Sequence, residues 1–114
     1  MSYLPQKNFN SETLVSSYDL TSGDTTLVSS DISNYSKFSL QFNVVDIRGL
    51  PNFDIEQSLD GVNWSYISQA SVIPNGNSTF ILDKQFFSGT KLRVCLNTGQ
   101  NSSGTCTIIL LTKR

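Results

Sequence analysis

The residues of this chain that could do chemistry are few, and none of them is a histidine. Nucleophile activation by histidine, histidine-based zinc sites and a histidine pH switch are therefore excluded. Asp54 and Glu56 are two positions apart in an alternating segment, so both carboxylates project from one strand face, where they could share a proton or bind a cation. Because Phe53 and Ile55 fill the alternate positions, we interpret the pair as the solvent side of a half-buried strand. We predict no catalytic residue there.

A short carboxylate and a glycine mark a turn at Asp60 and Gly61. We expect Asp60 to accept hydrogen bonds from its own downstream backbone and Gly61 to adopt a positive φ. A calcium site would need several convergent oxygens, and Asp60 and Asn63 supply too few side-chain ligands for one. The sequence therefore predicts neither a metal site nor a cofactor.

Trp64, the single tryptophan, follows that turn directly. If exposed, its ring could stack on a sugar, and Tyr66 on the same strand face would extend the platform. A lone tryptophan in a small β-sandwich is most often the anchor between the two sheets. We therefore predict that Trp64 lies in the core and keep Trp64 and Tyr66 as the alternative ligand platform.

The two cysteines, Cys95 and Cys106, flank the last predicted hairpin. One register gives that hairpin a continuous apolar face and turns Cys95 to the opposite side. Its pairs are Leu96 with Cys106, Val94 with Ile108 and Leu92 with Leu110. We therefore predict two free thiols and no disulfide, and neither thiol has nearby in sequence the histidine or basic pair that would mark it as a nucleophile.

The elements that must position these residues are predicted to be strands. Val, Ile, Thr, Tyr, Phe and Trp account for 37 of the 114 residues, against four of Ala, Met and Glu. Candidate strands, most of them separated by glycine-containing turns, are found at residues 13–20, 25–32, 37–45, 53–57, 64–67, 79–82, 91–96 and 105–111, with the Phe86-Phe87 pair between the sixth and seventh. We predict a single antiparallel all-β sandwich of about eight strands, immunoglobulin-like or jelly-roll, with no helix longer than a turn.

The predicted core follows from the same alternation, which is cleanest over residues 37–45. It consists of Phe38, Leu40, Phe42, Ile55, Trp64, Val94, Leu96, Ile108 and Leu110.

Residues 1–12 lack alternation and contain Pro5, so we predict an extended N-terminal arm there and the sandwich domain at residues 13–114. Tyr3, Leu4 and Phe9 are its candidate partner-binding residues. The arm lacks the pattern of a signal peptide, and no window of the sequence approaches the ~18 apolar residues needed to cross a bilayer, so no membrane partner is expected.

The surface composition is polar and nearly neutral. Ser, Thr, Asn and Gln account for 44 residues, charged residues are 15%, and the net charge is −1. The eight basic residues are scattered and form no stripe that could neutralise a run of phosphates. We therefore expect no nucleic-acid partner.

Three stretches of the chain share a recurring pattern: S-x-D-G-x-x-W within residues 57–67, R-V within residues 91–94 and G-T-x-x-I within residues 104–108. Over residues 36–113 the pattern resembles the small β-sandwich capsid-associated proteins of tailed bacteriophages, with a crAss-like or related phage of Bacteroidetes as the source that the resemblance suggests. The resemblance implies a non-enzymatic decoration or auxiliary protein of the virion, assembled in the host cytoplasm. It implies binding to other virion subunits, first among them the major capsid protein, and allows a homo-oligomer.

A carbohydrate-binding or host-adhesion module is the alternative function. The S-x-D-G-x-x-W hairpin also occurs in bacterial adhesion and carbohydrate-binding domains, and both functions can use the same fold.

Overall fold

The computed structural model describes residues 9–33, 35–49, 51–70, 76–84, 89–98 and 102–113. It is an all-β structure, and the one helical element in these ranges is the 3-10 turn Leu20–Ser22. The strands are β1 (Phe9–Asp19), β2 (Thr25–Val28), β3 (Lys37–Arg48), β4 (Asn52–Ser58), β5 (Ser65–Ala70), β6 (Gly76–Lys84), β7 (Lys91–Asn97) and β8 (Ser103–Lys113). The predicted fold class is confirmed.

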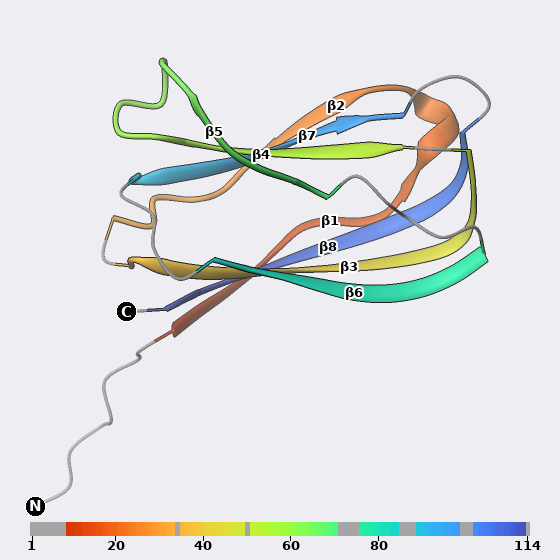
Figure 1. Cartoon of the computed structure of the whole chain (residues 1–114), viewed down its shortest axis with the longest axis horizontal. Helices are drawn as coiled ribbons and strands as arrows, with labels where there is room; N and C mark the ends of the chain where they lie inside the picture. Colours follow the sequence, from red (N-terminus) through yellow and green to blue (C-terminus); the bar gives the residue numbers. More distant parts are fainter. Residues whose placement is uncertain are drawn as a thin grey trace, which may run out of the picture.

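The strands form two four-stranded sheets, which lie one above the other in Figure 1. One sheet has the order β1-β8-β3-β6 and the other the order β2-β7-β4-β5, with every pair antiparallel. The chain changes sheet at every connection except that between β4 and β5. This order is that of an eight-stranded jelly roll.

The core between the sheets is built by inward residues at every second position. In β3, for example, Phe38, Leu40, Phe42 and Val44 are buried, while the intervening residues are partly exposed. Phe42 packs against Phe53 of the other sheet with 4.9 Å between ring centroids. Eight of the nine predicted core residues are buried, and the exception is Trp64.

The predicted pairing of the last two strands is wrong. β7 and β8 belong to different sheets: β7 pairs with β2 and β4, and β8 pairs with β1 and β3. Their apolar residues instead face the shared core from opposite sides. The alternation pattern could not distinguish the two arrangements, because strands that pair in one sheet and strands that face each other across the core both place every second residue inward. The six residues of this set are Leu92, Val94, Leu96, Cys106, Ile108 and Leu110. The predicted absence of a disulfide between Cys95 and Cys106 does not require this pairing, and both thiols are free.

The strand β1 begins earlier than expected, at Phe9, which pairs with Lys113. Four of the twelve residues predicted as an arm are therefore part of a sheet. The alternation was hidden because the inward positions of this stretch are polar; the Glu12 carboxylate accepts hydrogen bonds from the backbone N–H and the hydroxyl of Ser30. Tyr3, Leu4 and the Phe86-Phe87 pair lie outside the described residues.

Candidate functional site

The turn between β4 and β5 is held by the side chain of Asp60. Its Oδ1 accepts hydrogen bonds from the backbone N–H groups of Val62 and Asn63, both at 2.8 Å, and from the Ser58 hydroxyl at 2.9 Å. Its Oδ2 accepts one from the Asn63 amide. The bonds from Asn63 and Val62 hold the pKa of the Asp60 carboxyl well below its usual range. Gly61 has φ +77°, as predicted.

A second set of contacts fixes the same turn against the segment that leads into β7. The backbone N–H of Thr90 donates to the carbonyl of Ser58, and that of Gly89 donates to Oε1 of Gln57. A side chain at position 89 would not fit, because its Cβ would lie 2.9 Å from the Ser58 carbonyl oxygen. The β4 side of the turn is therefore anchored by these contacts, in addition to the bonds that Asp60 makes within the turn.

Trp64 follows the turn at the surface, so its predicted place in the core is wrong. The ring is partly exposed and lies under the guanidinium of Arg93, whose Cζ is 4.4 Å from the ring centroid. Nε of Arg93 donates to Oε1 of Glu56 at 2.6 Å. The physical reason is the position of residue 64, which precedes the first residue of β5 and is not paired into the sheet.

A hollow of about 360 Å³ opens beside this ring. We call it the Trp64 hollow; its lining residues are Gln57, Ser58, Leu59, Asp60, Asn63, Trp64, Ser65 and Gly89. Tyr66 is not among them. It pairs with Glu56 and is 62% exposed on the neighbouring strand.

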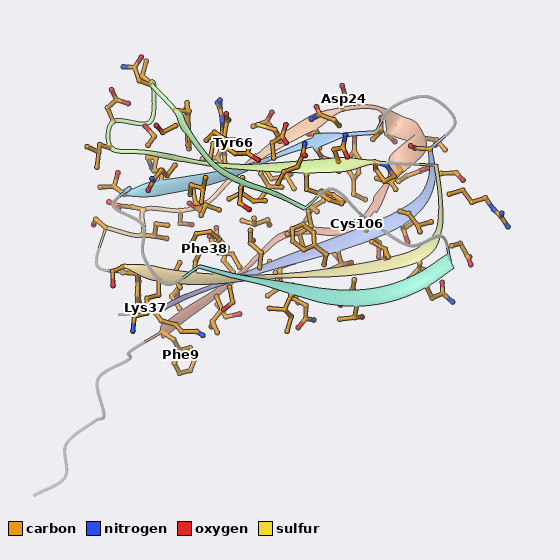
Figure 2. The ribbon with its side chains drawn as sticks, viewed as in Figure 1. Phe9, Asp24, Lys37, Phe38, Tyr66 and Cys106 are labelled. Carbon is orange, nitrogen blue, oxygen red and sulfur yellow. The ribbon has the colours of Figure 1, made fainter. Side chains whose placement is uncertain are left out.

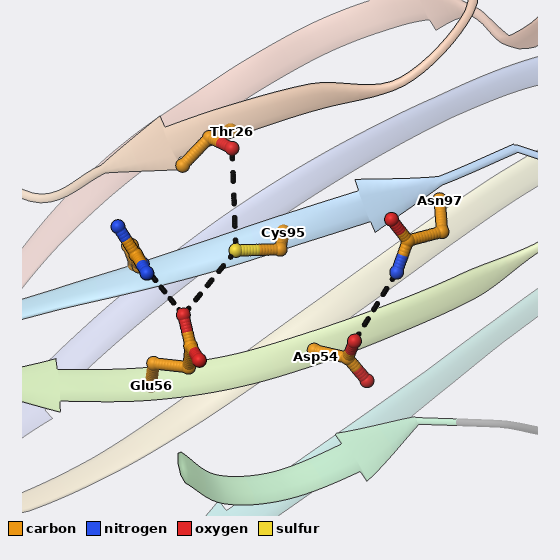
Figure 3. A network of polar contacts seen from close by, with 6 residues as sticks. Thr26, Asp54, Glu56, Cys95 and Asn97 are labelled. Carbon is orange, nitrogen blue, oxygen red and sulfur yellow. Dashed lines mark hydrogen bonds and ion pairs between the residues drawn. The ribbon is translucent and has the colours of Figure 1, made fainter. Parts of the chain in front are cut away.

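The outward face of the β2-β7-β4-β5 sheet continues from Arg93 as a row of polar contacts (Figure 3). Asp54 accepts hydrogen bonds from the amides of Gln69 and Asn97, at 2.7 and 3.1 Å. Asp54 and Glu56 therefore lie opposite the buried Phe53 and Ile55, as predicted, and each carboxylate has partners of its own. We call this surface, made of Thr26, Asp54, Glu56, Gln69, Arg93, Cys95 and Asn97, the charged face.

The two thiols occupy different environments. Cys95 on the charged face lies between Thr26 and Glu56, and its Sγ donates to Oε1 of Glu56 at 3.4 Å. Burial, followed by the bond to Glu56, raises the pKa of Cys95. Burial in the core raises the pKa of Cys106 to about 12. Both thiols are therefore protonated at neutral pH.

Metal-binding clusters and membrane-spanning helices are both absent from the part of the chain that the structure describes. No group of three or more Cys, Asp or Glu side chains there could hold a metal ion. No helix in the same ranges has the length and apolarity to cross a membrane.

Sequence reasoning missed Arg93, Gln57 and Gly89 as neighbours of Trp64. Arg93 reaches the ring because β7 pairs with β4, which sets it opposite Glu56. The signal that could have found it is the opposite charge of Glu56 and Arg93 on two alternating strands, but the sequence does not say that these two strands pair.

Comparisons with known proteins give a likeness of fold. No model of a protein family matches the chain, and no curated protein matches it. PirA is 13% identical with a TM-score of 0.50, and the match covers 97% of each chain.

Two further solved structures are similar over most of this chain. The C-terminal domain of a chitobiase from Bacteroides fragilis is 18% identical with a TM-score of 0.49, over 80% of this chain. A structure described as CBM4 is 14% identical with a TM-score of 0.49, over 78% of this chain. This chain spans 62% and 61% of the length of those two proteins. At these identities the comparisons bear on the β-sandwich fold alone.

Proposed function

We propose that the protein is a carbohydrate-binding module that holds a neutral sugar in the Trp64 hollow and does not convert it. The observation that carries the proposal is the position of Trp64, which lies at the surface beside a hollow and not between the sheets. A pyranose ring presents C–H groups on its faces and hydroxyl groups around its rim. An aromatic wall combined with polar groups at its edge is complementary to both.

The lining of the hollow supplies the polar part of that match. Hydroxyl groups of a sugar both donate and accept hydrogen bonds, and the hollow offers Oδ2 of Asp60, which accepts one bond within the turn, together with the amide oxygen of Asn63 and the hydroxyl of Ser65. Its volume of about 360 Å³ is near the lower end of the range of about 300–1,000 Å³ common for ligand pockets. It therefore suits one sugar unit, with the rest of a chain lying outside.

The charge of the hollow favours an uncharged ligand. Asp60 is the one charged residue among the described residues that line it, and its depressed pKa keeps it ionised. The nearby Arg93 is already paired with Glu56. Sugars that carry a carboxylate or sulfate would therefore meet repulsion there.

Arg93 serves as a positioning residue in this proposal. Its guanidinium covers one part of the indole and is itself held by Glu56, so the ring is oriented before the ligand binds. An oriented ring loses less conformational entropy on binding than a mobile one.

The test is a glycan array of neutral and acidic oligosaccharides, followed by calorimetry on the best ligand. We expect Trp64→Ala to weaken binding by about 2 kcal/mol or more, roughly 30-fold, as for an aromatic anchor. Trp64→Phe should retain part of the affinity. Phe9→Ala removes an aromatic ring that is 54% exposed on the other sheet, and serves as the matched control.

Two results would overturn the proposal. One is an array on which no neutral glycan binds. The other is a Trp64→Ala variant that binds as well as the wild type, which would separate the ligand from the hollow.

A capsid-associated protein of a tailed phage is the second candidate function. It is supported by the jelly-roll topology, which viral capsid domains also use, and by the exposed ring of Phe9 at the start of β1. Its test is mass spectrometry of purified particles, combined with a deletion of residues 1–8. The deletion stops there because residues 9–12 are paired in β1. Absence of the protein from particles would end this candidate.

A further inference from the structure

The outward face of the β1-β8-β3-β6 sheet differs from the charged face in its chemistry. A hollow of about 410 Å³ on this face extends from its middle toward the Lys113 end and is lined by Ser11, Ser39, Gln41, Ile81, Ile109, Leu111 and Lys113. We call the surface of these residues the neutral face. In Figure 2, Phe9 lies beyond this sheet on its outer side, whereas Phe38 lies between the sheets.

Aliphatic side chains gather at the middle of the neutral face. Gln41 pairs with Ile81 on one side and with Ile109 on the other, so the two isoleucines flank it on neighbouring strands. Ile81 is 60% exposed, and Leu111 follows two positions after Ile109 on β8. The amide of Gln41 donates to Asn43 at 3.1 Å, so this polar group is partly satisfied within the face. Such an apolar centre with a polar surround is typical of a protein interface.

We propose that a second copy of this chain packs on the neutral face, sheet against sheet, to form a two-fold dimer. The proposal concerns a surface on the side of the sandwich away from the Trp64 hollow and does not depend on carbohydrate binding.

The size of the face is sufficient for a weak dimer. Four strands about 4.8 Å apart, with up to 12 residues at about 3.4 Å each, cover at most roughly 800 Å² per copy. Two copies would bury at most roughly 1,600 Å², which lies within the range for specific interfaces. We therefore expect a dissociation constant in the micromolar range.

The charges of the face suit a second copy placed around a two-fold axis. Among the residues whose side chains the structure describes, the charged ones on the outward side of this sheet lie at its two ends: Lys37 and Lys113, which pair in register, at one end, and the exposed Asp46 and Arg48 of β3 at the other. When two sheets pack with their strands running in opposite directions, the two lysine ends lie far apart and the uncharged centres meet. The lysine pairs are then separated by more than the screening length of about 10 Å at ordinary salt.

Such a dimer would place its two Trp64 hollows on outward sides. The hollow belongs to the turn between β4 and β5, and both of these strands are in the other sheet. A bivalent particle of this kind would gain avidity on a surface that repeats the same ligand.

The test is sedimentation equilibrium of the full chain over a wide concentration range, with two substitutions of the same kind. We expect the wild type to dimerise and Ile81→Lys to raise the dissociation constant by at least about tenfold, because two lysines would be buried at the centre. Val62→Lys is the matched control: Val62 is 77% exposed in the turn beside the Trp64 hollow, away from the neutral face, and its replacement should leave the dimer intact. Thermal melting of each variant checks that the fold is retained.

A wild type that remains monomeric throughout the range would overturn the proposal. So would a dimer that Ile81→Lys leaves unchanged, or one that Val62→Lys disrupts to the same extent. Little change of the dissociation constant between low and high salt is also expected, and a steep dependence would contradict an uncharged interface. If these tests fail, the dimer proposal fails alone. The proposal of glycan binding is still tested separately by Trp64→Ala.

Discussion

The two outward faces of this sandwich have the same backbone pattern and different chemistry. On the charged face, Glu56 and Arg93 form an ion pair, and Asp54 accepts hydrogen bonds from the amide of Asn97. On the neutral face, the central positions hold Ile81 and Ile109 around Gln41. Most inward positions of both sheets are constrained by packing and hold aliphatic or aromatic side chains. The outward positions escape that constraint, and their chemistry is the better guide to what each face contacts.

The largest expected effect is the difference in the free energy of unfolding between a core substitution and substitutions on the two outward faces. Phe42 is fully buried against Phe53, so Phe42→Ala should lower the free energy of unfolding by about 3–5 kcal/mol. Trp64→Ala and Ile81→Lys should each cost less than about 1.5 kcal/mol, because neither side chain fills the core. Urea unfolding followed by circular dichroism measures all three. A Trp64 variant as unstable as the Phe42 variant would mean that the tryptophan is structural.

A smaller effect should follow from loss of the ion pair on the charged face. Glu56→Gln removes the charge that holds Arg93, and we expect a loss of about 1 kcal/mol in stability. The chain has one tryptophan, so its fluorescence reports on the ring that Arg93 covers. We expect the emission to shift when Glu56 is changed. Lys37→Gln, a charge change on the neutral face, should leave the emission unaltered and is the control.

The third effect is a pH dependence that comes from the turn beside the Trp64 hollow. The pKa of Asp60 is depressed in the folded state, so the stability it contributes is present above the ordinary carboxyl pKa of about 4. That contribution is lost as the pH falls through the folded-state pKa. Asp60→Asn should therefore be less stable than the wild type at pH 7, and the difference should shrink below about pH 4. Urea unfolding from pH 7 to pH 2.5 measures it; a difference that stays constant would contradict the hydrogen-bonded carboxylate.

The smallest effect expected is at the thiol of the charged face. Cys95→Ser keeps a donor for Glu56, so stability should change by less than about 0.5 kcal/mol. Cys106→Ser places a hydroxyl in the core and should cost about 1–3 kcal/mol. Thermal unfolding of the two variants compares them directly. Equal losses would contradict the different placement of the two cysteines.

Much of the local structure was predictable because its causes are local. Alternation over residues 37–45 identified the inward residues of β3 correctly, since a strand's side chains alternate whatever its partner is. The turn at Asp60 was predicted for the same kind of reason: its carboxylate binds backbone groups two and three residues further along. The start of β1 was missed because Glu12 faces inward to bind Ser30 and so breaks the apolar pattern.

The sequence by itself determined that this chain is an all-β sandwich, the inward residues of its clearly alternating strands and how its Asp60 turn is built. The tertiary structure alone decided that β7 lies between β2 and β4 while β8 lies between β1 and β3. From the pairing of the strands follow the contact of Arg93 with Trp64 and the joining of Ile81 and Ile109 on one face. The physical reason is that alternation assigns each side chain to one side of its strand but carries no information on which strand lies next to it. That choice depends on contacts between residues far apart in the chain, which exist only once both sheets have formed.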